Sequence, residues 1–74
     1  MIKSITATCL DTMKKISVDV NGITLDTVLN TPSDTRENWD AYTDIHYTIK
    51  QCCEYNGITF WSASIEDESW SSEM

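Results

Sequence analysis

Apolar side chains recur at helical spacing between Asp34 and Tyr55, over a large part of a chain of only 74 residues. They fall within one stripe of the helix surface, and charged residues occupy the opposite side. Asn56-Gly57 follows, a pair that suits a left-handed helix end or a hairpin turn, and the helical period before it favours the helix end. So short a chain has room for one thin core, which must form against this stripe. The stripe comprises Tyr42, Ile45, Ile49, Cys52 and Cys53, with Trp39 and His46 at its edge.

Two residues are candidates to cap the start of this helix. Residues 30–34 break the preceding pattern with an Asn-Thr-Pro-Ser-Asp run. Thr31 could cap the helix with Pro32 at its first position. Alternatively, Asp34 could cap it with Glu37 three residues later.

The first 28 residues predict an antiparallel meander of three strands. Apolar and polar residues alternate over residues 2–10 and again over 15–20, which is typical of strands with one buried face. Residues 11–14 would form the turn between them. Asn21-Gly22 offers the two positive-φ positions of a type I′ turn, so residues 23–28 are predicted to return as a third strand.

Residues 58–65 predict a last strand, with apolar side chains on both faces. This is typical of a central strand or of one whose second face meets a partner. Residues 66–74 carry four acids beside Trp70, which predicts a flexible acidic tail. The predicted fold is therefore α+β, an antiparallel β-sheet of about four strands (β-β-β-α-β) with one helix packed on one face. Residues 1–65 would form the single domain and residues 66–74 the tail.

The excess negative charge lies entirely in the second half of the chain. Twelve acids against five lysines and arginines give a net charge of −7 at pH 7. Residues 1–36 hold four of each sign, whereas residues 37–74 hold eight acids and Lys50 alone. Such a surface repels phosphate backbones and anionic lipids, so we expect no direct nucleic-acid or membrane binding. The uneven distribution points instead to a protein partner.

The sequence gives limited signals of compartment. No apolar run approaches the ~18 residues of a membrane span, and the first residues lack the apolar core of a secretory signal. The three cysteines are an odd number, and the adjacent Cys52 and Cys53 are poorly placed to pair with each other. A bridge from Cys9 to either remains open in an oxidising compartment. We expect reduced thiols and a cytoplasmic location.

The residues capable of catalysis or metal binding are few and poorly spaced. His46 and Cys53 lie two helical turns apart, about 10 Å along the axis, too far for one zinc ion. A Cys–His nucleophile needs direct contact and a third group that orients the base. Asp40 and Asp44 share a helix face but lack a predicted cleft. We therefore predict no enzymatic activity, no metal and no cofactor, with the cysteines in the core.

The outer helix face and the acidic tail are the candidate binding elements. Tyr47 is a large aromatic residue on the polar side of the helix, between carboxylates. It could be an ordinary solvated residue, or an anchor that supplies contact area at low entropic cost. The tail repeats the combination of carboxylates and one aromatic residue. Its ordinary role would be solubility, but Trp70 has no use in such a tail, so it would either fold back onto the domain or insert into another protein. The candidate partner-binding residues are Asp40, Asp44, Tyr47, Glu54, Glu66, Asp67, Glu68 and Trp70.

In size, acidity and absence of catalytic motifs, the chain resembles the small inhibitors that phages encode against host defence, anti-CRISPR and anti-restriction proteins among them. The resemblance is one of type, without a shared motif, so it assigns no role to any residue. It implies a nucleic-acid mimic that occupies the basic surface of a protein or ribonucleoprotein complex in a host cytoplasm, as a monomer or homodimer. The alternative is a non-catalytic structural module that oligomerises through the final strand. A regulatory domain that binds a small molecule is a distant third.

Overall fold

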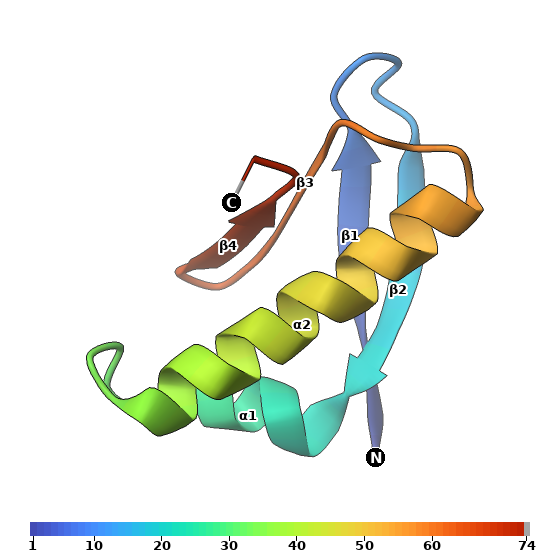
Figure 1. Cartoon of the computed structure of the whole chain (residues 1–74). Coiled ribbons are helices and arrows are strands. Elements are labelled where there is room, and N and C mark those ends of the chain that lie inside the picture. Colours follow the sequence, from blue (N-terminus) through green and yellow to red (C-terminus); the bar gives the residue numbers. More distant parts are fainter. Residues whose placement is uncertain (74) are drawn as a thin grey trace.

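A computed structural model describes residues 1–73 as one four-stranded sheet and two helices. All neighbouring strands are antiparallel, in the spatial order β2-β1-β3-β4. Helix α2 crosses the sheet diagonally, and α1 lies against its N-terminal half (Figure 1). The predicted α+β class and four-stranded antiparallel sheet are confirmed. The elements are β1 (Ile2–Cys9), β2 (Lys15–Asn21), α1 (Gly22–Asn30), α2 (Arg36–Tyr55), β3 (Trp61–Ile65) and β4 (Glu68–Ser71).

The long helix is found where its apolar stripe predicted it. Its cap is Thr35, whose hydroxyl accepts from the Asn38 N–H at 3.3 Å, so neither predicted cap residue is used. The helix ends at Asn56, whose N–H bonds back to the last turn, and Gly57 follows with a φ of +74°. The predicted left-handed helix end is therefore confirmed.

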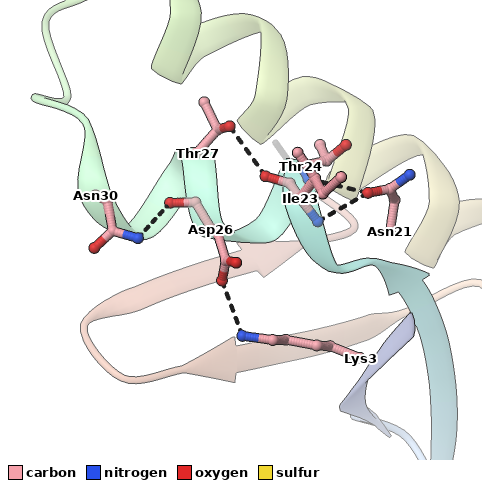
Figure 2. Close-up of polar contacts among 7 residues, drawn as sticks. All are labelled: Lys3, Asn21, Ile23, Thr24, Asp26, Thr27 and Asn30. Atoms are coloured by element: carbon pink, nitrogen blue, oxygen red, sulfur yellow. Dashed lines mark hydrogen bonds and ion pairs between the residues drawn. The ribbon is translucent and has the colours of Figure 1, made fainter. Parts of the chain in front are cut away.

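The predicted third strand is wrong, because residues 22–30 form helix α1. Asn21 has an extended backbone, and its side-chain oxygen accepts from the N–H groups of Ile23 at 2.9 Å and Thr24 at 3.2 Å (Figure 2). Asn21 therefore caps a helix where a hairpin turn was expected. Leu25 and Val28 are buried three residues apart, as a short amphipathic helix requires.

Gly22 is required by a close approach of the backbone. Its N–H donates to the carbonyl of Met1 at 2.8 Å, and an added Cβ would lie 3.0 Å from that oxygen. A side chain at this position would push the first residue away from the start of α1. Nearby, Lys3 Nζ lies 2.9 Å from Asp26 Oδ1 and links β1 to α1 (Figure 2). Both side chains are 40% exposed, so this pair contributes less than about 1 kcal/mol.

The core lies between α2 and the face of the sheet that carries the alternating apolar residues. Ile5 and Val18 are buried on β1 and β2, as their alternation predicted, and Ile45 and Ile49 cover them from α2. Trp61 is buried on β3, which lies between β1 and β4. The predicted strand 58–65 is shorter in the structure: residues 58–60 precede β3, in which Trp61 and Ala63 share the buried face and Ser62 and Ser64 the other, so the apparent two-sided apolar pattern does not belong to one strand.

The predicted tail is wrong over residues 68–71, which form the edge strand β4. Trp70 is only 2% exposed, and its indole N–H donates to the backbone carbonyl of Tyr42 at 3.0 Å. Its ring stacks on that of Tyr42, with 5.1 Å between centroids. The packed unit thus extends past the predicted boundary at residue 65, and Met74 lies outside the described residues.

Candidate protein-binding site

The outer face of α2 carries the predicted acidic side chains. Asp40, Asp44 and Glu54 are exposed, and Tyr47 between them is 59% exposed. Arg36 approaches Asp40 at 3.7 Å and Lys50 approaches Glu54 at 4.0 Å. Such exposed pairs, one helical turn apart, are weak, so they leave the carboxylates available to a stronger cationic partner.

Three more carboxylates, Glu66 and Asp67 of the β3–β4 loop and Glu68 at the start of β4, lie toward the N-terminal half of α2 (Figure 1). The Tyr42 hydroxyl donates to the carbonyl of Ser69, and His46 Nε2 lies 3.0 Å from the carbonyl of Ser71. Four residues of α2 therefore run alongside two residues of β4, because both segments are about 6 Å long. This register directs the β3–β4 turn, which carries Glu66 and Asp67, toward the N-terminal half of α2 (Figure 1).

Most of the net charge gathers at this end of the molecule. Residues 34–44 contribute three net negative charges, and Glu66, Asp67 and Glu68 contribute three more, so together they hold six of the seven. We call the carboxylates of the N-terminal half of α2 and of residues 66–68, which lie at the same end of the molecule, the acidic patch. Its members are Glu37, Asp40, Asp44, Glu66, Asp67 and Glu68. Glu54, the remaining predicted acid, lies at the other end of α2.

The aromatic members of the site differ from the prediction. Trp70 is buried in the core and is not available as an anchor. Trp39, which the helical pattern placed at the edge of the buried stripe, is 62% exposed. It lies four residues before Thr43 and eight before Tyr47, on the same ridge of α2. Sequence reasoning missed Trp39 as a binding residue, although its acidic neighbours Glu37 and Asp40 were a usable signal.

The outer edge of β4 is covered by side chains from α2. The carbonyls of Ser69 and Ser71 point away from β3 and accept hydrogen bonds from Tyr42 and His46. To donate to a carbonyl, His46 must carry its proton on Nε2. Burial, and then the charge of Glu68, raises the pKa of the Tyr42 hydroxyl, which keeps it protonated as a donor. A second chain could pair with this edge only after displacing both side chains.

The described residues offer little space for a small molecule. A pocket of about 80 Å³ lies between the end of α2 and β3 and is lined by Lys50, Glu54, Ile58, Thr59, Trp61 and Ser72. This volume is far below the ~300–1,000 Å³ that is typical of ligand-binding pockets. Among residues 1–73, no group of three or more metal-ligating side chains is assembled. No helix within that range is long and apolar enough to cross a membrane.

The three cysteines are free and play separate roles. Cys9 ends β1, and hydrogen bonds from the Thr12 hydroxyl and from the N–H groups of Thr12 and Asp11 lower its pKa. His46 lies instead beside Trp61, with 5.4 Å between ring centroids. In the described part of the chain, none of the cysteines is hydrogen-bonded to His46.

We expect Cys53 to make the fold sensitive to alkaline pH. Burial, and then the neighbouring Cys52 and Cys9, raises the pKa of the Cys53 thiol from 9.0 to about 11. The folded state thus holds this proton more tightly than the unfolded chain, so the stabilisation is complete below pH 9 and is lost as the pH rises toward 11. At pH 10 the loss is about 1.4 kcal/mol.

Chemical denaturation in the presence of a reductant, at pH 7.5 and pH 10, measures this loss. The wild-type protein should lose about 1.4 kcal/mol more than Cys53→Ala between the two pH values. Cys52→Ala, a change at a half-buried neighbour, should keep most of the wild-type pH dependence, because burial is the largest cause of the raised Cys53 pKa and Cys52 a smaller one. Equal losses in wild-type protein and Cys53→Ala would contradict the assignment.

Comparison with known proteins gives no relative for this chain, since no family model, no curated protein and no solved structure matches it. The role of the acidic patch is therefore inferred from its own geometry.

Proposed function

We propose that this protein is a small, non-catalytic inhibitor that binds the basic surface of a larger protein or ribonucleoprotein complex. The observation that carries the proposal is that six of the seven net negative charges belong to residues 34–44 and 66–68, at the end of the molecule that also exposes Trp39. The target surface would be one that otherwise grips nucleic acid, so the protein acts as a nucleic-acid mimic. Anti-CRISPR or anti-restriction inhibition in a host cytoplasm is the biological setting that we propose.

The combination of charge and exposed aromatic rings supports binding that is both fast and lasting. Carboxylates spread over one end of the molecule create a field that steers a basic partner and raises the association rate. Trp39 and Tyr47 supply large, amphipathic contact area, and such residues dominate the energetics of many interfaces. Dissociation is then slowed by the aromatic contacts, and most differences in affinity arise in this step.

The rigidity of the support also favours this function. The α2 residues of the patch lie on a helix packed on the core, and the loop that carries Glu66 and Asp67 is held by Tyr42 and by the buried Trp70. Carboxylates fixed in this way lose little entropy on binding. A flexible acidic tail would have to be ordered first.

Affinity capture from a host lysate, followed by measurements on the purified partner, tests the proposal. We expect a basic nuclease or nucleic-acid-binding assembly that the wild-type protein releases when salt rises from about 50 to about 500 mM. Asp40→Lys combined with Asp44→Lys should weaken binding by roughly tenfold to a hundredfold. Trp39→Ala should weaken it mainly through faster dissociation.

A charge-matched control is Asp11→Lys combined with Glu73→Lys, which changes the net charge equally away from the acidic patch. This variant should keep most of the affinity, and the partner's nucleic acid should compete with the wild-type protein. Binding that is insensitive to salt, unaffected by the Asp40 and Asp44 reversals, or compatible with bound nucleic acid would refute the proposal.

A further inference from the structure

The second edge of the sheet, on β2, has no cover of the kind found on β4. The Cys9 N–H donates to the carbonyl of Lys14 at 2.7 Å, so odd-numbered residues of β1 turn their backbone groups toward β2. Through the observed register, Ile16 and Val18 are the residues of β2 that bond to β1. Lys15, Ser17 and Asp19 therefore direct their N–H and C=O groups outward. We call these outward groups the β2 edge.

The β2 edge is long and unprotected. Strand β2 has seven residues, and Lys15, Ser17 and Asp19 are exposed. Among residues 1–73, no turn, loop or side chain forms a hydrogen bond with their backbone groups. No proline or inward-pointing charge interrupts the strand, and its edge charges, Lys15 and Asp19, are of opposite sign. An open edge of this kind is a template for one more strand.

The side chains of the edge are complementary to themselves. We propose that two copies of this chain pair β2 with β2 in antiparallel orientation, around a two-fold axis at Ser17. In this register Lys15 of each copy lies opposite Asp19 of the other. Both are exposed on the same face of the sheet, so the pairing creates two identical cross-strand ion pairs. The outward groups of the three residues form hydrogen-bonded pairs, six backbone hydrogen bonds in all.

Charge selects this edge for a protein that otherwise repels its own copies. Each copy carries a net charge of −7, but residues 14–21 hold Lys14 and Lys15 against Asp19 alone. The dimer therefore joins the copies at a segment that adds nothing to their excess negative charge. Because β2 and β4 are opposite ends of the strand order, the acidic patches lie on the outer sides of the dimer. The same pairing covers Ile16, which is only half-buried in one copy.

Self-association is thus placed at the β2 edge and not at the final strand, where the sequence predicted it. It does not depend on the inhibitory function proposed above. The β4 edge is occupied by Tyr42 and His46, whereas the β2 edge lacks any such cover in the described residues. The assembly would be one continuous antiparallel sheet, with the α2 helices on the same side. It is a closed, two-fold symmetric pair, in which each copy presents the same surface.

Sedimentation equilibrium, with exchange of the two charges, tests this register. A wild-type dimer has twice the mass of the 8.4 kDa chain. Lys15→Asp alone and Asp19→Lys alone each create two like-charge pairs, and each should weaken dimerisation at least tenfold. A mixture of these two variants should form a heterodimer. The combined Lys15→Asp and Asp19→Lys variant should restore the homodimer.

Ser17→Pro offers a second test, since it removes an outward N–H at the axis and no backbone hydrogen bond to β1, although it also removes the side-chain hydrogen bond between Ser17 and Ser4. This variant should be monomeric, with the far-ultraviolet circular dichroism of the wild-type protein. A wild-type protein that stays monomeric up to about 500 μM, or a dimer that none of these variants affects, would overturn the proposal.

Discussion

Replacing Trp70 with alanine should lower the free energy of unfolding by about 3–5 kcal/mol. The indole is 2% exposed, stacks on Tyr42 and donates a hydrogen bond to the Tyr42 carbonyl. Alanine would leave a cavity between β4 and α2 and an edge strand with little to hold it. Because a chain of this size has only a few kcal/mol of stability in total, we expect Trp70→Ala to be largely unfolded at 37 °C.

The matched control is Trp39→Ala, the same substitution on the exposed face of α2. It removes a side chain that is 62% exposed, so its effect on stability should stay within about 1 kcal/mol. Urea denaturation followed by circular dichroism measures both variants. Similar stabilities for the two alanine variants would mean that residues 68–71 do not belong to the folded unit.

The parts of the fold that were predicted correctly are those with a strong local period. Strands β1 and β2 follow the two-residue alternation around Ile5 and Val18, and α2 follows the helical spacing of Ile45 and Ile49. These patterns arise because each segment must bury one face, whichever element of the fold it packs against. The end of α2 at Gly57 was also predictable, since a left-handed residue there suits glycine.

The mistaken hairpin shows where a local pattern has two solutions. Asn21-Gly22 suits a type I′ turn, but asparagine is equally a good helix cap and glycine also permits close backbone approach. Leu25 fits the return strand and also the helix. The helix is favoured by the carbonyl of Met1, which bonds to Gly22 from the start of β1. Both strands of the first pair separate Met1 from Gly22 in the sequence. The residues around the turn therefore do not reveal this contact.

The mistaken tail has a different cause. The composition of residues 66–74 is typical of a solvated segment, and only Trp70 argues otherwise. Its burial depends on a helix almost thirty residues earlier, at Tyr42. The same long-range contact between β4 and α2 determines where the acidic residues 66–68 lie relative to the helix. The outer face of α2 was predictable from a helical wheel, but the position of Glu66 and Asp67 toward the N-terminal half of α2 follows from the pairing of β4 with β3.

The two proposals are compatible because they use opposite ends of the strand order. A dimer through the β2 edge would present two acidic patches, each beside its own β4. Such a dimer could engage two basic surfaces at once, and bivalent binding would raise the apparent affinity without any new contact. Monomeric Ser17→Pro would then bind a single basic surface as the wild-type protein does and lose only this bivalent gain.

The packing of α1 against α2 depends on the buried side-chain amide of Asn38. Replacing Asn38 with alanine should lower the free energy of unfolding by about 2–3 kcal/mol. Asn38 is 5% exposed, and its side-chain nitrogen donates to the carbonyls of Val28 at 2.9 Å and Thr31 at 3.2 Å. In a longer helix the Val28 carbonyl would accept from the N–H of residue 32, but Pro32 has none. Asn38 supplies the missing donor from α2, so Asn38→Ala leaves that carbonyl without a partner.

Asn38→Asp separates the lost donor from lost packing, because aspartate has nearly the same shape. At pH 7 its carboxylate would face two carbonyl oxygens, so this variant should be at least as unstable as Asn38→Ala. Burial and these oxygens would raise the pKa of the new carboxyl in the folded state, and protonation would restore one donor. Its stability relative to the wild-type protein should therefore rise as the pH falls from 7 to 4.

The matched control is Asn30→Asp, since Asn30 is exposed and makes one surface hydrogen bond to the Asp26 carbonyl. It should cost less than about 1 kcal/mol. If Asn38→Asp and Asn30→Asp had equal stability at pH 7, the buried amide would not be what joins α1 to α2.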